Sequence, residues 1–258
     1  MEKQGSLVNV GLGMTLGAHI SPISRNLIEQ ADVVFLLASN NLVEEWVKSM
    51  NDNVISLQTY YEEGQSRLTS YRQMVEVMLS EVRAGKAVCG AFYGHPGVFA
   101  WPPHESIRQA LKEGYKAHME PGISAEDCLY ADLGIDPGSK GCQHYEASQL
   151  MFYEKNIDVS SYLVVWQFGL AGDRSLAMFS TPESYRQVFV DWLLTMYPED
   201  HPVTIYECAV LPIDYPRIEQ VPLAKLASQP VSIKTTIVLP PAKEQTPNEA
   251  IVKLLKNL

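Results

Sequence analysis

The amino-acid sequence predicts an α/β protein made of two α/β domains, and two observations lead to this fold class. Over roughly the first 120 residues, short apolar segments alternate with amphipathic ones, which is typical of a mostly parallel sheet covered by helices. Further along, the strand-like segments become longer and richer in β-branched residues, which favours some antiparallel pairing. The predicted borders are 1–122 for the N-terminal domain, 123–242 for the C-terminal domain and 243–258 for a tail with a short helix.

Hydrophobic periodicity assigns the elements of the first domain. Buried apolar runs that end at turn residues predict strands at 7–13, 32–37, 54–57, 87–92 and 115–119. Apolar residues that recur at helical spacing predict helices at about 22–31, 66–83 and 103–113. These elements alternate along the chain, as a parallel sheet requires.

Pro121-Gly122 marks the border to the second domain because this pair interrupts regular structure. Ser124 and Asp127, three residues apart, predict a capping box at the start of a new helix. Beyond it, strands are predicted at 163–168, 203–210 and 235–239.

The tail carries a helix signal of its own. Thr246 is the expected N-cap, with a proline at the first helical position and Glu249 at the third. An apolar stripe follows at Ile251, Leu254, Leu255 and Leu258. This stripe either packs on its own domain or docks onto a partner.

Composition narrows the class of function. Apolar residues make up 46% and charged residues 19% of the 258 residues, which is ordinary for a globular protein. A net charge of −10 gives no general attraction to nucleic acid or to an anionic membrane, and no run approaches the ~20 apolar residues of a membrane span. The four cysteines contain no CxxC pair, which argues against a zinc site or a disulfide framework and suits a reducing cytoplasm. We therefore expect a cytoplasmic protein with no metal, nucleic-acid or membrane partner.

Two glycine-containing turns are candidates for ligand binding. Gly11 and Gly13 follow the first strand, but a dinucleotide-binding GxGxxG is absent because position 16 is leucine. The segment Tyr93-Gly94-His95-Pro96-Gly97 follows a buried strand, where α/β sheets bind ligands. Its glycines permit close approach of a ligand to the backbone, although the loop could also serve only as a tight connection.

A third candidate lies around Tyr61, Arg67 and Tyr71. Arg67 and Tyr71 are four residues apart on the apolar face of the predicted helix 66–83, so both polar ends are expected to point inward. A buried guanidinium beside a phenol favours the phenolate and lowers the pKa of the tyrosine. The alternative is a core tyrosine beside an arginine whose aliphatic stem packs on apolar surface.

These motifs together resemble a known superfamily. The glycine turn, the loop YGHPGVF and Pro121-Gly-Ile-Ser-Ala125 resemble the tetrapyrrole methylases, S-adenosylmethionine (SAM) enzymes with two α/β domains and the cofactor in the cleft between them. That superfamily usually has Gly-Asp-Pro where this sequence has Gly94-His95-Pro96. With this departure, PGISAEDCLYADLGIDP and the Tyr61, Arg67 and Tyr71 set, residues 6 to 242 closely resemble the borosin peptide backbone α-N-methyltransferases.

The resemblance implies specific roles for residues of this sequence. It implies four catalytic residues, Tyr61, Arg67, Tyr71 and Tyr93. It implies contacts to SAM, or to its product S-adenosylhomocysteine (SAH), from Tyr93, His95, Val98, Ser124, Ala125, Gln167, Ala209, Thr235 and Thr236. It also implies a homodimer. Because an amide nitrogen is a poor nucleophile, Tyr71 is the expected base and Arg67 is expected to stabilise its phenolate. Tyr61 and Tyr93 are expected hydrogen-bond donors.

The length of the tail leads to one further expectation. The best-known borosin enzymes carry their substrate fused at the C-terminus, whereas only 17 residues follow Pro241 here. The sequence therefore predicts a split enzyme that acts on a separate precursor peptide. Two alternatives stay open: a methyltransferase of the same superfamily for a small ring substrate such as a tetrapyrrole, and a non-catalytic peptide- or cofactor-binding protein.

Overall fold

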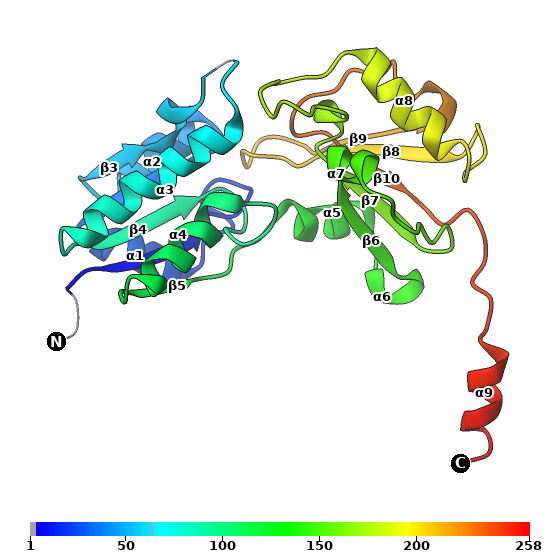
Figure 1. Cartoon of the computed structure of the whole chain (residues 1–258), viewed down its shortest axis with the longest axis horizontal. Helices are drawn as coiled ribbons and strands as arrows, with labels where there is room; N and C mark the ends of the chain where they lie inside the picture. The colour runs from blue at the N-terminus through cyan, green and yellow to red at the C-terminus, as the bar shows by residue number, and fades with distance from the viewer. Residues whose placement is uncertain (1–3, 63) are drawn as a thin grey trace. The chain divides into compact units, whose positions relative to one another are not determined.

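The computed structural model describes residues 4–62 and 64–258, which divide into two compact units (Figure 1). The first unit runs to Leu133 and takes in two later segments, Ser175–Met178 and Cys208–Pro216. The second unit consists of Gly134–Arg174, Phe179–Glu207 and Arg217–Leu258. The division between the units follows Leu133, whereas the border expected from the sequence lies at 122/123.

The first unit contains a five-stranded sheet in the order β3-β2-β4-β1-β5, and every pairing in it is parallel. Its strands are β1 (Ser6–Gly11), β2 (Val33–Leu37), β3 (Val54–Ser56), β4 (Ala87–Phe92) and β5 (Lys116–Met119). The predicted parallel sheet is therefore confirmed, with strand ends that differ by up to two residues. The largest shift is at β1, which ends at Gly11 because Gly13 belongs to the following turn.

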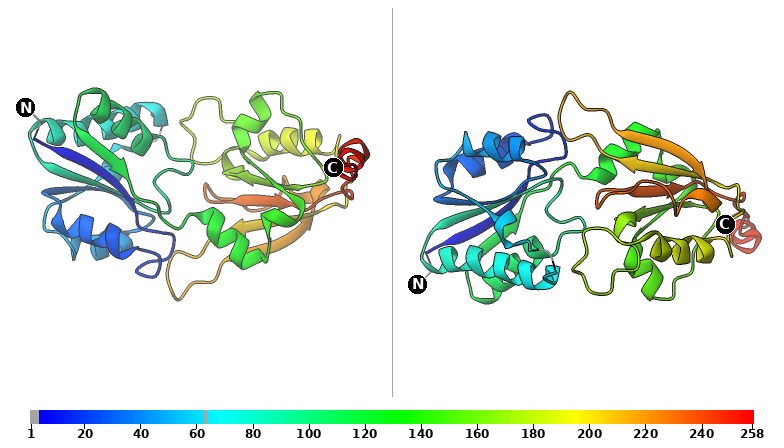
Figure 2. Two further views of the ribbon diagram at one scale, coloured as in Figure 1. Left: turned by 90° about the horizontal axis from the view of Figure 1, so that it is seen from below. Right: turned by 90° about the horizontal axis from the view of Figure 1, so that it is seen from above.

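Helices cover both faces of this sheet (Figure 2). On one face lie α1 (Pro22–Gln30) and α2 (Asn41–Lys48), which bury Ile28, Val43 and Val47. On the other lie α3 (Arg67–Arg83) and α4 (Trp101–Lys112), whose buried side chains pack with Leu7 and Phe35. Helix α2 was missed by the sequence analysis, although Asn40 caps it and its two buried valines are four residues apart.

The second unit has a mixed five-stranded sheet in the order β6-β7-β10-β8-β9. Strands β6 and β7 are parallel, while β10 is antiparallel to both β7 and β8, and β9 is antiparallel to β8. The strands are β6 (Cys142–Glu146), β7 (Tyr162–Trp166), β8 (Pro202–Glu207), β9 (Arg217–Pro222) and β10 (Thr236–Leu239). The expected antiparallel pairing is confirmed.

The two edge strands of this sheet were not predicted from the sequence, and the reason is the same for both. Strand β6 is half-buried throughout and β9 is mostly exposed, so neither shows the apolar run of a buried strand. The predicted strand 203–210 was too long at its end. Strand β8 stops at Glu207, and Val210 instead packs in the apolar core beside α1 and α2 of the first unit.

Short helices complete both units. Helix α5 (Ala125–Leu133) belongs to the first unit, and α6 (Pro137–Lys140), α7 (Ala147–Phe152), α8 (Glu183–Leu193) and α9 (Glu249–Leu255) belong to the second. The apolar core of the second unit lies between its sheet and helices α7 and α8, with Leu150, Phe189 and Val190 among its buried side chains.

The two predicted helix caps had different outcomes. The capping box at α5 is confirmed, because the Ser124 N–H donates to Asp127 Oδ2 (2.6 Å) and the Asp127 N–H donates to Ser124 Oγ (3.3 Å). The N-cap of α9 is Asn248, whose Oδ1 accepts from the N–H of Ile251 (3.2 Å), and not Thr246. Asparagine is the better cap of the two, which explains the later start. The apolar stripe of α9 is exposed, with Leu254 at 63%.

No helix within 4–62 and 64–258 combines the length and the apolar character needed to cross a bilayer. Across the same residues, no group of three or more His, Cys, Asp or Glu side chains is placed to bind a metal ion.

Candidate functional site: loops at the carboxyl edge of the first sheet

The two glycine turns singled out in the sequence are joined in the structure. Gly13 donates its N–H to the carbonyl oxygen of Gly94 (3.1 Å), and Gly94 donates to the carbonyl oxygen of Gly13 (2.9 Å). The turns follow the neighbouring strands β1 and β4, whose onward connections leave in opposite directions across the sheet. Ligands of open α/β sheets bind at such a switch point.

A third backbone segment meets these turns so closely that side chains are excluded. A Cβ atom on Gly11 would lie 2.5 Å from the carbonyl oxygen of Gly94 and 2.7 Å from the Cα of Gly122. A Cβ on Gly122 would also lie 2.5 Å from that oxygen. The segments after β1, β4 and β5 therefore come together backbone to backbone, which only glycine permits at these positions.

His95 shapes the loop after β4 through its own ring. Its Nδ1 accepts the N–H of Gly97 (2.8 Å), and its carbonyl oxygen accepts the N–H of Val98 (3.2 Å). Because Nδ1 is the acceptor, it carries no proton in this arrangement. An aspartate at this position could accept the same hydrogen bond in an Asx turn. The histidine thus preserves the turn while it replaces an anionic acceptor with an imidazole.

An aromatic row lies beside the first turn of α3. The rings of Tyr61 and Tyr71 meet edge to face with centroids 6.2 Å apart, and Tyr71 stacks on Trp101 at 6.3 Å. Tyr61 and Tyr71 are half-buried against the apolar core, whereas Trp101 is 39% exposed. Arg67, the first residue of α3, is half-buried one turn before Tyr71, as the spacing predicted.

Electrostatics keep two tyrosines of this group protonated. Burial raises the pKa of Tyr61, and the nearby phenols of Tyr71 and Tyr93 raise it further, while the charge of Arg67 lowers it by less. Loss of water around the hydroxyl, followed by the proximity of Tyr71, also raises the pKa of Tyr93, although 46% of this residue remains exposed. The charge of Arg67 therefore lowers the pKa of Tyr61 by less than burial raises it. Both phenols are suited to donating hydrogen bonds.

Several residues that were assigned to the cofactor lie near the glycine turns. The carbonyl oxygen of Ala209 accepts from Thr15 Oγ1 (3.4 Å), and Leu16 donates its N–H to Val210 (2.9 Å), so Ala209 lies beside the turn after β1. Ala125 is the first residue of α5, directly after Ser124. Both the N–H and the hydroxyl of Ser124 are occupied by Asp127, so its polar groups serve the helix cap.

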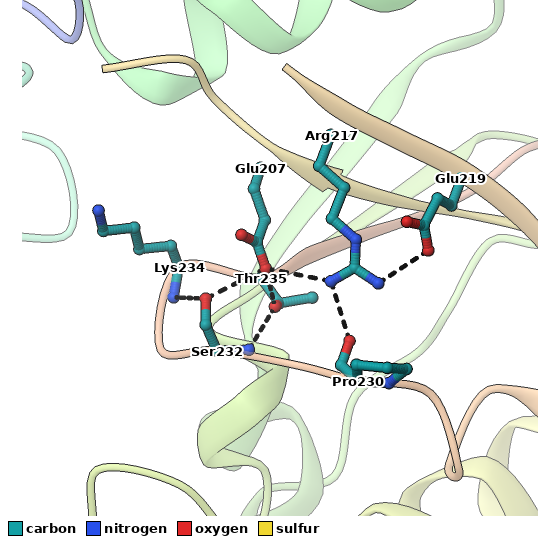
Figure 3. Close-up of polar contacts among 7 residues, drawn as sticks. All are labelled: Glu207, Arg217, Glu219, Pro230, Ser232, Lys234 and Thr235. Carbon is teal, nitrogen blue, oxygen red and sulfur yellow. Dashed lines mark hydrogen bonds and ion pairs between the residues drawn. The ribbon is translucent and has the colours of Figure 1, made fainter. Parts of the chain in front are cut away.

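The three remaining assigned positions form a second cluster, in the second unit. Gln167 has a left-handed backbone (φ 56°) at the end of β7, and the next residue, Phe168, donates its N–H to the carbonyl oxygen of Thr235 (2.9 Å). Thr235 is fully buried and donates its hydroxyl to Glu207 (2.5 Å), as Figure 3 shows. Thr236, the first residue of β10, is paired with Tyr206.

Comparison with known proteins identifies the family. The family model of tetrapyrrole (corrin/porphyrin) methylases matches residues 6–227. The chain belongs to this family.

Curated relatives of this chain include fungal proteins whose names combine a methyltransferase with a peptide precursor. A "methyltransferase/ribosomally synthesized cyclic peptide gymnopeptides precursor" of Gymnopus fusipes is 40% identical, with 100% of this chain and 62% of the relative covered. The corresponding omphalotin A precursor of Omphalotus olearius is 37% identical, with 99% and 62% covered. A type I borosin cyclic peptide precursor of Coprinopsis marcescibilis is 40% identical, with 93% and 63% covered. The chain thus spans somewhat less than two thirds of the length of these relatives.

Solved structures confirm the two-domain α/β fold of the family. Cobalt precorrin-4 methyltransferase superposes with a TM-score of 0.65 at 17% identity, covering 91% of this chain and 94% of that structure. Uroporphyrin-III-C-methyltransferase from Thermus thermophilus gives a TM-score of 0.63 at 15% identity, with 92% and 93% covered. At these identities the likeness concerns the fold alone.

Two residues that were not singled out from the sequence belong to these clusters. Trp101 stacks on Tyr71, and its signal was a large aromatic residue directly before Pro102-Pro103 at a helix start. Glu207 binds Thr235, and its signal was a carboxylate that directly follows the buried run Val203–Tyr206.

Proposed function

We propose that this methylase uses SAM to methylate backbone amide nitrogens of a ribosomally made peptide. The observation that carries the proposal is the row of Tyr61, Tyr71 and Trp101 with Arg67 beside it, in the unit whose three glycine-lined segments converge. Relatives at 37–40% identity, whose names combine a methyltransferase with a ribosomal peptide precursor, support it.

The residues present suit SAM. A ligand with nucleoside and amino-acid parts needs backbone hydrogen-bonding groups within reach, and Gly11, Gly94 and Gly122 let three backbone segments come together at one edge of the sheet. In our proposal the contacts come from Tyr93, His95, Val98, Ser124, Ala125 and Ala209 of the first unit and Gln167, Thr235 and Thr236 of the second. Bound SAM supplies an electrophilic methyl group.

The protein side chains would prepare the amide for reaction. The lone pair of an amide nitrogen is delocalised into the carbonyl, so the N–H proton must be removed as the new N–C bond forms. In our assignment Tyr71 accepts this proton on its phenolate oxygen, and Arg67 stabilises both that phenolate and the negative charge that develops on the amide oxygen. Tyr61 and Tyr93, whose pKa values are raised, keep their protons and donate hydrogen bonds to the same oxygen.

A peptide assay tests the proposal directly. The part of the Gymnopus fusipes relative that this chain does not match is supplied as a separate polypeptide with SAM, and tandem mass spectrometry locates each added methyl. We expect methyl groups on backbone nitrogens, which would also establish that the peptide can act in trans. Methyl groups found only on side chains would refute the proposal. Turnover of a porphyrin-type ring with no dependence on Arg67 and Tyr71 would favour the alternative ring methylase.

Two further expectations belong to the same proposal. A homodimer predicts a mass of twice 28.8 kDa in light scattering. Cytoplasmic location predicts that a fluorescently tagged chain stays in the cytoplasm of the host cell. A non-catalytic binding protein, the remaining alternative, predicts that SAM and peptide bind without any methylated product.

A further inference from the structure

The carboxylate of Glu207 is the centre of a polar network in the second unit (Figure 3). It accepts hydrogen bonds from Thr235 Oγ1 (2.5 Å) and Ser232 Oγ (3.1 Å), and it pairs with Arg217 Nη1 (3.4 Å). The side chains of Glu207 and Arg217 are only 23% and 24% exposed. Charge-assisted hydrogen bonds that are shielded from water in this way are stronger than those at an open surface.

The network holds both ends of the segment 230–235. Arg217 Nη1 donates to the carbonyl oxygen of Pro230 (2.9 Å) at one end, and Thr235 binds Glu207 at the other. Inside the segment, the N–H of Ser232 donates to Thr235 Oγ1 (2.8 Å). One ion pair therefore fixes the path of six residues that lead into β10.

The segment 230–235 adjoins residues that are proposed to contact SAM. The same holds for the pair of Glu207 and Arg217, which closes the base of the loop 208–216. Glu207 and Arg217 face each other across β8 and β9, and they flank the segment 208–216 that carries Ala209. On the other side, a Cβ on Gly169 would lie 2.2 Å from the carbonyl oxygen of Ser232, so the turn after Gln167 rests directly on the segment that Glu207 holds.

We propose that Glu207 is a positioning residue for the SAM site, on the basis of the function proposed above. Its carboxylate does not contact SAM. It fixes the backbone positions of Thr235 and Thr236 and of the turn that follows Gln167. Through Arg217 it also fixes the base of the loop 208–216, which carries Ala209. The consequence is a site whose second-unit contacts depend on one carboxylate.

Binding of SAH to purified protein, measured by calorimetry, tests this role without requiring turnover. The wild type is compared with Glu207→Gln, which removes the charge, and with Ser232→Ala, which removes one donor to Glu207. The matched control is Glu219→Gln, because Glu219 binds the other nitrogen of the same guanidinium, Arg217 Nη2 (2.8 Å), and is 51% exposed. Urea unfolding without ligand reports on stability separately.

We expect Glu207→Gln to weaken SAH binding by about tenfold, as for one charge-assisted hydrogen bond, and Ser232→Ala to weaken it by about threefold. The KM for SAM should rise while the KM for peptide stays unchanged, and Glu219→Gln should match the wild type. If Glu207→Gln does not fold, Ser232→Ala carries the test. Wild-type SAH affinity in the folded variants would overturn the inference even if they unfold more easily. Absence of SAH binding by the wild type would instead overturn the proposed function and this inference with it.

Discussion

The two units of the chain contribute different kinds of residue to the proposed site. In the first unit, a parallel sheet brings together phenols, a guanidinium and a histidine, and Tyr93 and Trp101 remain 46% and 39% exposed. In the second, a mixed sheet presents Thr235, which is fully buried and whose hydroxyl is held by Glu207. The first unit therefore contains the side chains suited to proton transfer and hydrogen bonding. The second unit contains backbone that internal polar contacts hold in place.

The largest effect is expected when the proposed base is removed from the first unit. We expect Tyr71→Phe or Arg67→Ala to lower kcat by about 10²–10⁴, the range typical of a general base, with SAH binding retained. Tyr60→Phe is the matched control, because Tyr60 adjoins Tyr61 and packs on the same core. Full activity of either variant in single-turnover measurements would show that the substituted residue is not required for methyl transfer.

The next largest effect is expected when a side chain is introduced where the backbones meet at the glycine turns. In Gly11→Ala the new Cβ meets the carbonyl oxygen of Gly94 at 2.5 Å, so we expect a loss of about 1–3 kcal/mol in the free energy of unfolding, together with loss of SAH binding. In the control Gly114→Ala no atom lies within 4 Å of the new Cβ. The free energy of unfolding should fall by about 1 kcal/mol, because alanine disfavours the left-handed backbone at this position (φ 86°). The two variants should differ most in calorimetric SAH affinity; equal affinities would contradict a site at these turns.

The acceptor role of His95 predicts a smaller effect. His95→Asn can keep the hydrogen bond to the Gly97 N–H, whereas His95→Ala cannot. We expect His95→Ala to lose about 1 kcal/mol of SAH binding energy and His95→Asn to lose less. If both variants lose the same amount, the imidazole contributes something other than the turn.

The smallest effect concerns Tyr61 and appears only at alkaline pH. Because burial raises its pKa in the folded state, the stabilisation from the protonated phenol is complete below the unfolded-state pKa of about 10 and is lost as pH rises above it. Tyr61→Phe should therefore reduce the alkaline decline of the unfolding free energy between about pH 10 and pH 11. Identical declines in urea titrations of the two proteins would show that Tyr61 ionises normally.

The sequence predicted the first unit better than the second, and the reason is physical. A parallel sheet buried on both faces gives uninterrupted apolar runs such as Val33–Leu37, which are visible in the sequence. Edge strands such as β9, with one buried face at most, leave no such run. Helix α7, six residues long, is likewise too short to show a periodic pattern.

The candidate site shows the same contrast between local and distant contacts. Arg67 and Tyr71 lie one helical turn apart, so their spacing alone placed them together. Glu207 reaches Ser232 and Thr235 across 25 and 28 residues, and that pairing exists only because β8 and β10 are neighbours. Residue spacing could therefore predict the first pair but not the contacts of Glu207, whereas Thr235 itself was assigned from the family resemblance.

One measurement tests the central claim that the first unit performs backbone methylation. The separate peptide is incubated with SAM and either the wild type or Tyr71→Phe, and tandem mass spectrometry counts the methyl groups on backbone nitrogens. The account predicts backbone methylation by the wild type and almost none by Tyr71→Phe, although both proteins bind SAH equally. Equal backbone methylation by the two proteins would contradict it.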